Sequence, residues 1–111
     1  MKTRLPIHDL IDERIPRHIG VHDDDALHLC WLAQQLPQNA VVVEIGSFKG
    51  RSTAFIASGL KSGQIYCIDV WSNVMDLIAH ADNMKLLGYH NMVTQIRGLS
   101  KEVAKSWSKT W

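Results

Sequence analysis

Two acidic residues and a loop between two glycines are the residues of this sequence whose spacing suits a nucleotide-like ligand. Glu44 lies near the end of the apolar run "AVVVEI", and the loop from Gly46 to Gly50 follows that run directly. Asp69 ends a second apolar run, "QIYCID", roughly 20 residues further on. Glycines let a backbone turn tightly beside a ligand, and a helix that starts after such a loop attracts a carboxylate or phosphate. A carboxylate at the end of the following strand can accept hydrogen bonds from both hydroxyls of a ribose.

Three ligands compete for this loop. A nucleoside triphosphate is bound by a GxxxxGK[ST] loop, and "GSFKGRS" has no such lysine–serine pair. A dinucleotide is bound by GxGxxG, but Phe48 stands where the second glycine should be and would obstruct a pyrophosphate. S-adenosylmethionine carries no phosphate; its ribose would meet Asp69, and its ammonium would lie near the negative charge of Glu44. The loop therefore favours S-adenosylmethionine, with a nicotinamide-dependent oxidoreductase as the disfavoured alternative.

The elements that would position these residues alternate between strand and helix. Short apolar runs rich in β-branched residues predict strands at 40–45, 64–69 and 92–96. Helical periodicity predicts one helix before the first strand, one after each of the first two, and a last one beginning near Ser100. This order predicts an α/β fold, a Rossmann-like three-layer sandwich whose partial parallel sheet has the strand order 3-2-1 and helices on both faces. Residues 1–22 are expected to form a lead-in to a domain over 23–111.

The same periodicity predicts which helix positions face the core. They are Ala26, Leu29, Cys30, Ala33 and Leu36 in the first helix, Thr53, Ile56, Ala57 and Leu60 in the second, and Val74, Leu77, Ile78, Ala81 and Met84 in the third. The first strand is expected to be covered on both faces, with an edge that lacks a partner strand. His80 and His90 are expected at exposed positions.

Composition is that of an ordinary globular domain. The 111 residues are 46% hydrophobic and 21% charged, with a net charge of +1 and no basic stripe, which disfavours nucleic-acid and membrane-surface partners. The sequence shows neither a signal peptide nor a run long enough to span a membrane, so we expect a cytoplasmic protein. Cys30 and Cys67 lack CxxC spacing and are expected to be buried, reduced thiols.

Histidines offer an alternative metal site near the start of the chain. His18 and His22 are close in sequence, and His28 follows. Gly20 between the first two argues against a rigid helical pair, and no further ligand has clear spacing, so a metal site is disfavoured. His22 approaching the cofactor from the lead-in is a second disfavoured alternative.

Three segments together carry a family resemblance. "VVVEIGSFKGRSTAFIA", "GQIYCIDVW" and "LGYHNMVTQIRGLSKEV" resemble the N-terminal half of class I S-adenosylmethionine-dependent methyltransferases, most closely the small-molecule O-methyltransferase-like branch, over residues 24–111. The resemblance implies that the methionine part of the cofactor is surrounded by Glu44, Gly46, Phe48, Gly50 and Ser52. It implies that Asp69 holds the ribose. It also implies that the adenine is flanked by Val70 and Trp71 and bordered by Gly98 and Ser100.

The resemblance also implies an acceptor side that this sequence does not reach. In that branch it follows a fourth strand, where some relatives bind a divalent metal, and this sequence ends at "SWSKTW" before such a strand. We therefore assign no catalytic residue or metal ligand and expect a truncated half-domain of an enzyme that methylates a small-molecule hydroxyl. The alternative is a non-catalytic nucleoside-binding or assembly module that pairs, as a homo-oligomer, through its exposed strand edge.

Overall fold

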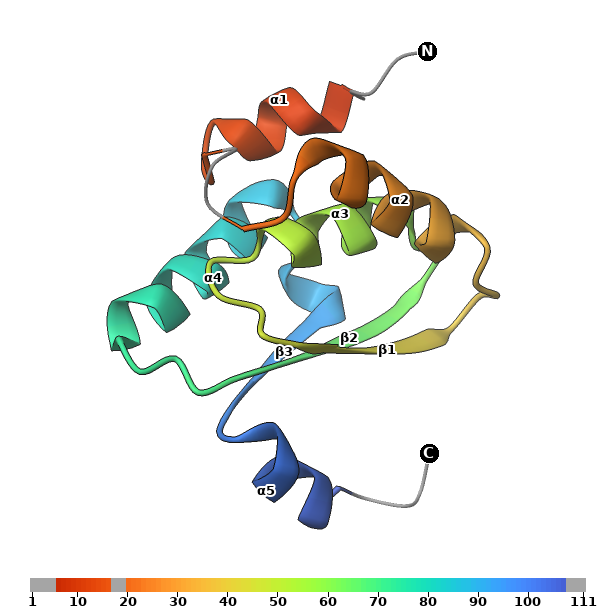
Figure 1. Ribbon diagram of the computed structural model, residues 1–111. Helices are drawn as coiled ribbons and strands as arrows, with labels where there is room; N and C mark the ends of the chain where they lie inside the picture. Colours follow the sequence, from red (N-terminus) through yellow and green to blue (C-terminus); the bar gives the residue numbers. More distant parts are fainter. Residues whose placement is uncertain (1–5, 17–19, 108–111) are drawn as a thin grey trace.

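The computed structural model describes residues 6–16 and 20–107, in which helices and strands alternate as the sequence predicts (Figure 1). Along the chain the elements are α1 (Pro6–Asp12), α2 (Asp23–Gln34), β1 (Ala40–Ile45), α3 (Arg51–Gly59), β2 (Gly63–Asp69), α4 (Val74–Leu87), the 3-10 helix η1 (His90–Met92), β3 (Val93–Arg97) and α5 (Ser100–Lys105). In this part of the chain, no helix has the length and hydrophobicity needed to cross a membrane.

The three strands form a parallel sheet in the order β1-β2-β3, which confirms the predicted strand order. The register sets Ile45 beside Ile68 and Asp69 beside Arg97. The carboxyl ends of the three strands therefore lie side by side at the same end of the sheet. Helices α2, α3 and α4 lie on one face of the sheet and α5 lies on the other (Figure 1). This confirms the α/β fold with helices on both faces.

The core between α2 and α3 follows the predicted helix faces. Ala26, Cys30 and Ala33 of α2 are buried, as are the four predicted positions of the second helix. The two helices approach closely at Gly59, where a Cβ atom would lie 2.2 Å from the carbonyl oxygen of Cys30. Both cysteines are free, buried thiols, as expected.

The predicted inward face of α4 is only partly right: Met84 is buried and Leu77 packs against the core, but the other three predicted positions do not face inward. Val74 and Ile78 are exposed, whereas the buried residues of this helix are His80, Asn83 and Met84. Apolar periodicity fails here because two of the inward side chains are polar and hydrogen-bonded; Asn83, for example, donates to the carbonyl oxygen of Lys49 at 2.9 Å. The expectation that His80 is exposed is therefore wrong as well, whereas His90 is exposed as expected.

Strand β1 lies at the edge of the sheet, as predicted, but only one of its faces is covered. Val41, Val43 and Ile45 point away from α2 and α3 and are exposed, Ile45 to 67%. The expectation of cover on both faces is wrong because the helix on that side, α5, contacts β2 instead. Pairing of two copies through this edge stays a prediction.

Candidate functional site

The carboxylate of Asp69 joins the end of β2 to the loop that follows β1. One of its oxygens accepts a hydrogen bond from the backbone N–H of Phe48 at 2.9 Å, and the other accepts one from the backbone N–H of Trp71 at 2.8 Å. A carboxylate offers about four lone-pair sites, so each oxygen can accept one further donor. The Asp69 side chain therefore lies beside the loop that follows β1, as the ribose-binding hypothesis requires.

The loop after β1 holds an unusual backbone conformation. Gly46 and Gly50 have φ values of 84° and 97°, in the left-handed region that favours glycine. Phe48 (φ 48°) and Trp71 (φ 40°) share this region although both carry bulky side chains. Strain of this kind persists only where surrounding contacts enforce it, and it clusters at functional sites. Here the Trp71 indole N–H donates to the carbonyl oxygen of Phe48 at 2.7 Å and holds the two strained residues together.

Two hollows open on either side of Gly46. The first, of about 280 Å³, is lined by Ile15, Gly20, Val21, Gly46, Ser47, Phe48, Lys49, Arg51 and Ser52. The second, of about 210 Å³, is lined by Ile45, Gly46, Ile68, Asp69, Val70, Gly98, Leu99 and Ser100. The structure thus brings together at these two hollows seven of the ten residues that the sequence singled out. Gly46, which lines both hollows, connects them.

Three of the ten predicted residues lie behind these hollows. The Trp71 side chain is 2% exposed and meets the His80 ring edge-on at 5.4 Å, so it belongs to the core and not beside the second hollow, where adenine was expected. Gly50 is buried against α4, where a Cβ atom would lie 2.8 Å from the Met84 methyl group. Glu44 is partly buried under α3 and accepts a hydrogen bond from Ser52 at 2.5 Å.

The lead-in segment forms a wall of the first hollow because Arg51 ties it down. The Arg51 side chain is 1% exposed and donates to the carboxylates of Asp12 at 2.5 Å and Asp23 at 2.8 Å. It also donates to the carbonyl oxygens of Val21 at 2.9 Å and Ile15 at 3.2 Å. The sequence did not reveal this role, because an arginine after a glycine loop is typical of an exposed position and nothing local links it to two distant aspartates.

Ser47 is a second site residue that the sequence did not single out. It lines the first hollow, and within the described part of the chain its buried hydroxyl makes no hydrogen bond of good geometry; its polar neighbour is the Cys67 thiol, whose pKa is raised mainly by burial and lowered slightly by this hydroxyl. A buried hydroxyl left unpaired costs about 1–3 kcal/mol. A ligand atom in the hollow could remove that cost, so Ser47 is a candidate ligand contact.

A buried chain of polar side chains runs behind the loop. Glu44 accepts hydrogen bonds from the hydroxyls of Ser52 and Thr53. The Thr53 hydroxyl also lies 3.1 Å from Nε2 of His80, and Nδ1 of His80 lies 3.1 Å from the amide nitrogen of Gln95. The chain connects β1, α3, α4 and β3, so it fixes the end of β1 relative to the rest of the sheet.

Burial keeps two members of this region uncharged. Desolvation lowers the pKa of His80 from 6.5 to about 4, against the opposing effect of the nearby Asp69 charge. Desolvation, together with the negative charge of Glu44, raises the pKa of the Cys67 thiol from 9.0 to about 12. At neutral pH the imidazole and the thiol are therefore both neutral, and neither serves as a ready general acid or nucleophile.

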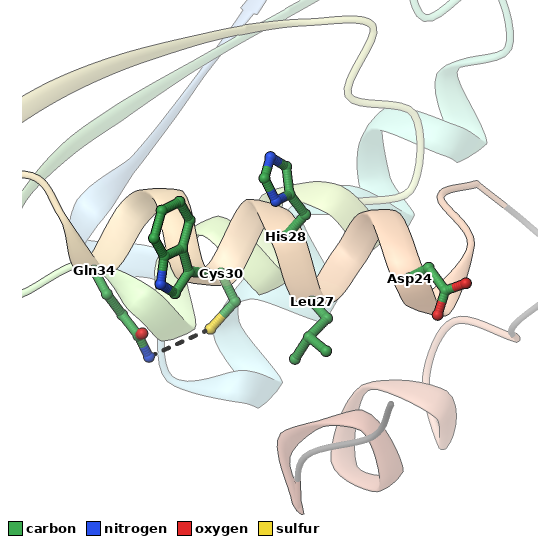
Figure 2. A pocket seen from close by; sticks show the side chains of 6 residues that line it. Asp24, Leu27, His28, Cys30 and Gln34 are labelled. Atoms are coloured by element: carbon green, nitrogen blue, oxygen red, sulfur yellow. Dashed lines mark hydrogen bonds between the residues drawn. The ribbon is translucent and has the colours of Figure 1, made fainter. Parts of the chain in front are cut away.

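A larger hollow on α2, of about 440 Å³, is a weaker candidate (Figure 2). It is lined by Asp24, Leu27, His28, Cys30, Trp31 and Gln34, all from α2 itself. Figure 2 shows that these side chains fan out along the helix and do not converge on a common point. Convergent polar groups characterise binding sites, so this hollow is not the site. His18, weighed with His22 and His28 as a metal ligand, lies outside the described residues.

Comparisons with known proteins show the family and the fold of this chain. A family model described as a methyltransferase domain matches residues 43–111, more than half of the chain. No curated protein sequence gives a match.

Solved structures share the fold at low sequence identity. A proposed O-methyltransferase from Klebsiella pneumoniae has a TM-score of 0.76 and 22% identity; the match covers 96% of this chain and 49% of that one. The O-methyltransferase TomG from Streptomyces achromogenes, solved with S-adenosylmethionine, has a TM-score of 0.77 and 20% identity, covering 90% and 47%. An O-methyltransferase from Bacillus cereus, solved with S-adenosylhomocysteine, has a TM-score of 0.71 and 21% identity, covering 90% and 44%. The chain thus spans about half the length of these relatives.

Proposed function

Since the chain belongs to the methyltransferase domain family, we propose that it forms the cofactor-binding half of an enzyme that transfers a methyl group from S-adenosylmethionine to a small-molecule hydroxyl. One observation carries the proposal. Two hollows meet at Gly46, with the Asp69 carboxylate at one and the bulky Phe48 at the other. A ligand with a nucleoside end and a phosphate-free amino-acid end suits that arrangement.

Each end of the cofactor has suitable partners. In the second hollow, Asp69 has lone pairs left for the ribose hydroxyls, and Val70, Gly98 and Ser100 line the space for the adenine. In the first hollow, free N–H groups at the start of α3 suit the carboxylate of the methionine part. The Ser47 hydroxyl, which makes no hydrogen bond of good geometry, adds a donor there.

The chain's own contribution to the reaction is binding and orientation. Methyl transfer is an in-line displacement, so the methyl donor and the acceptor oxygen must be held in alignment. S-adenosylmethionine supplies the activated methyl group when it is bound. We assign no general base, and a divalent metal on the acceptor side stays a prediction to which we assign no ligand. A cytoplasmic location also stays a prediction, with which the two free thiols agree.

Calorimetric titration with S-adenosylhomocysteine and, separately, with NAD tests the proposal. We expect S-adenosylhomocysteine to bind and NAD not to bind, because Phe48 stands where a pyrophosphate would pass. Binding of NAD without binding of S-adenosylhomocysteine would overturn the proposal in favour of an oxidoreductase. The family match does not favour the alternative of a non-catalytic assembly module.

A further inference from the structure

The Thr53 hydroxyl lies among three groups that could ligate a metal. The carboxylate of Glu44, the sulfur of Cys67 and a ring nitrogen of His80 all lie within 4.8 Å of one another. Sulfur, nitrogen and carboxylate oxygen are ligands that zinc accepts. However, the Thr53 oxygen lies 3.7 Å from the sulfur and 3.1 Å from the ring nitrogen, and its proton goes to Glu44. The centre of the cluster is thus occupied by a hydroxyl, and the cluster is a hydrogen-bond network.

The direction of each hydrogen bond follows from chemistry. An ionised Glu44 can only accept, so Thr53 donates to it. With its single proton used, the Thr53 oxygen must accept from Nε2–H of His80. Nδ1 of His80 then carries no proton and accepts from the side-chain amide of Gln95. The network therefore requires one neutral tautomer of His80, the Nε2–H form.

This arrangement immobilises the Glu44 carboxylate from two sides. Ser52 donates to one of its oxygens and Thr53 to the other, while His80 fixes the orientation of the Thr53 hydroxyl. A glutamate side chain with several rotatable bonds would otherwise lose rotamer freedom when it met a cation. A preorganised carboxylate has already lost that freedom.

We propose that Thr53 and His80 are positioning residues that hold the Glu44 carboxylate, which lies behind the first hollow against its lining residue Ser52, ready for the ammonium group of the cofactor. This role rests on the proposed function, whereas the tautomer of His80 does not. The charged or titratable groups around His80 are Glu44 from β1 and Cys67 and Asp69 from β2; α3 contributes the Thr53 hydroxyl and β3 the Gln95 amide. Desolvation of the buried ring favours the neutral form that the network needs and outweighs the opposing charge of Asp69.

A pair of substitutions at Thr53 tests the proposal. Thr53→Val keeps the shape of the side chain but removes the hydroxyl, whereas Thr53→Ser keeps the hydroxyl. Nitrogen-15 NMR of the histidine rings reports the tautomer in the ligand-free protein, and titration with S-adenosylhomocysteine reports affinity. We expect Nε2–H in the wild type and in Thr53→Ser. In Thr53→Val we expect mixed tautomers and an affinity lower by about tenfold, the effect of one hydrogen bond to a charged group.

A second variant covers the case in which Thr53→Val does not fold. Gln95→Met removes the donor to Nδ1 without touching Glu44, and we expect it to relax the tautomer preference of His80.

Two results would overturn the proposal: a wild-type His80 with the proton on Nδ1, or an affinity of Thr53→Val for S-adenosylhomocysteine equal to that of the wild type. Binding of Co²⁺ to the wild type with a thiolate charge-transfer band would also overturn it, because Glu44, Cys67 and His80 would then form a metal site. If the wild type shows the Nε2–H tautomer but does not bind S-adenosylhomocysteine, the proposed function fails and takes the positioning role with it, while the network stands.

Discussion

Phe48 and Asp69, 21 residues apart, are joined by a hydrogen bond of 2.9 Å from the Phe48 backbone N–H to the Asp69 carboxylate. The bond ties the strained loop after β1 to the end of β2. It places the acid beside the loop that we propose holds the methionine part of the cofactor. Asp69 therefore shapes the loop in this structure, and its remaining lone pairs are available for the ligand-binding role that we propose.

Replacing Asp69 by asparagine should weaken cofactor binding. The amide group puts N–H donors where one carboxylate oxygen accepted the N–H of Phe48 or Trp71, and it removes the charge that would hold the ribose hydroxyls. We expect affinity for S-adenosylhomocysteine to fall by about tenfold or more, measured by calorimetry. Asp82→Asn, at an exposed position of α4, is the matched control. Equal affinities of the two variants would contradict the role of Asp69.

Replacing Arg51 by methionine should release the lead-in segment. The substitution removes the cation that pairs with the largely buried carboxylates of Asp12 and Asp23, and breaking a buried ion pair typically costs about 3 kcal/mol or more. We expect the free energy of unfolding in urea to fall by about that amount, and limited proteolysis to cut first within residues 13–22. Arg14→Met, on an exposed side chain, should change neither. Unchanged urea stability of Arg51→Met would show that this ion-pair cluster contributes little to folding.

The two loop glycines should differ in their tolerance of alanine. Both have positive φ, so a Cβ atom costs about 1 kcal/mol at each. At Gly50 the Cβ would also lie 2.8 Å from Met84 Cε and 3.2 Å from His80 Cδ2, whereas nothing lies within 4 Å at Gly46. We expect Gly50→Ala to destabilise the protein by about 1–3 kcal/mol more than Gly46→Ala, because overpacking adds to the backbone strain. Thermal unfolding of the pair measures the difference, and equal melting temperatures would refute the steric part of the argument.

Stability should fall as the pH is lowered through the range in which His80 titrates. The folded-state pKa of about 4 lies below the ordinary 6.5, so the unfolded chain takes up this proton first. The contribution of the neutral His80 ring to the free energy of unfolding is complete above about pH 6.5. It declines as the pH falls towards 4 and then levels off, and a pKa shift of this size corresponds to about 3 kcal/mol. Urea unfolding at a series of pH values checks this. The slope in this window should shrink in His80→Gln and persist in His90→Gln, which replaces an exposed histidine. An identical slope in the wild type and His80→Gln would contradict the assignment.

The alternation of elements and the outline of the site were predictable from the sequence because both depend on local patterns. Runs of β-branched residues formed the strands, and helical periodicity gave the buried faces of α2 and α3. In a parallel sheet the strands end at one edge, so a glycine loop after one strand and Asp69 after the next had to lie close together.

Only the tertiary structure decided which polar side chains lie inside. The sequence predicted an exposed His80, but the helix turns it inward, where Thr53 and Gln95 supply both of its hydrogen bonds. Arg51 is likewise buried because Asp12 and Asp23, far away in the chain, converge on it. A prediction from hydropathy places a polar residue at the surface, because burying a polar side chain without hydrogen-bond partners costs free energy. Whether partners exist depends on contacts between distant segments, and those contacts come into being only when the chain has folded.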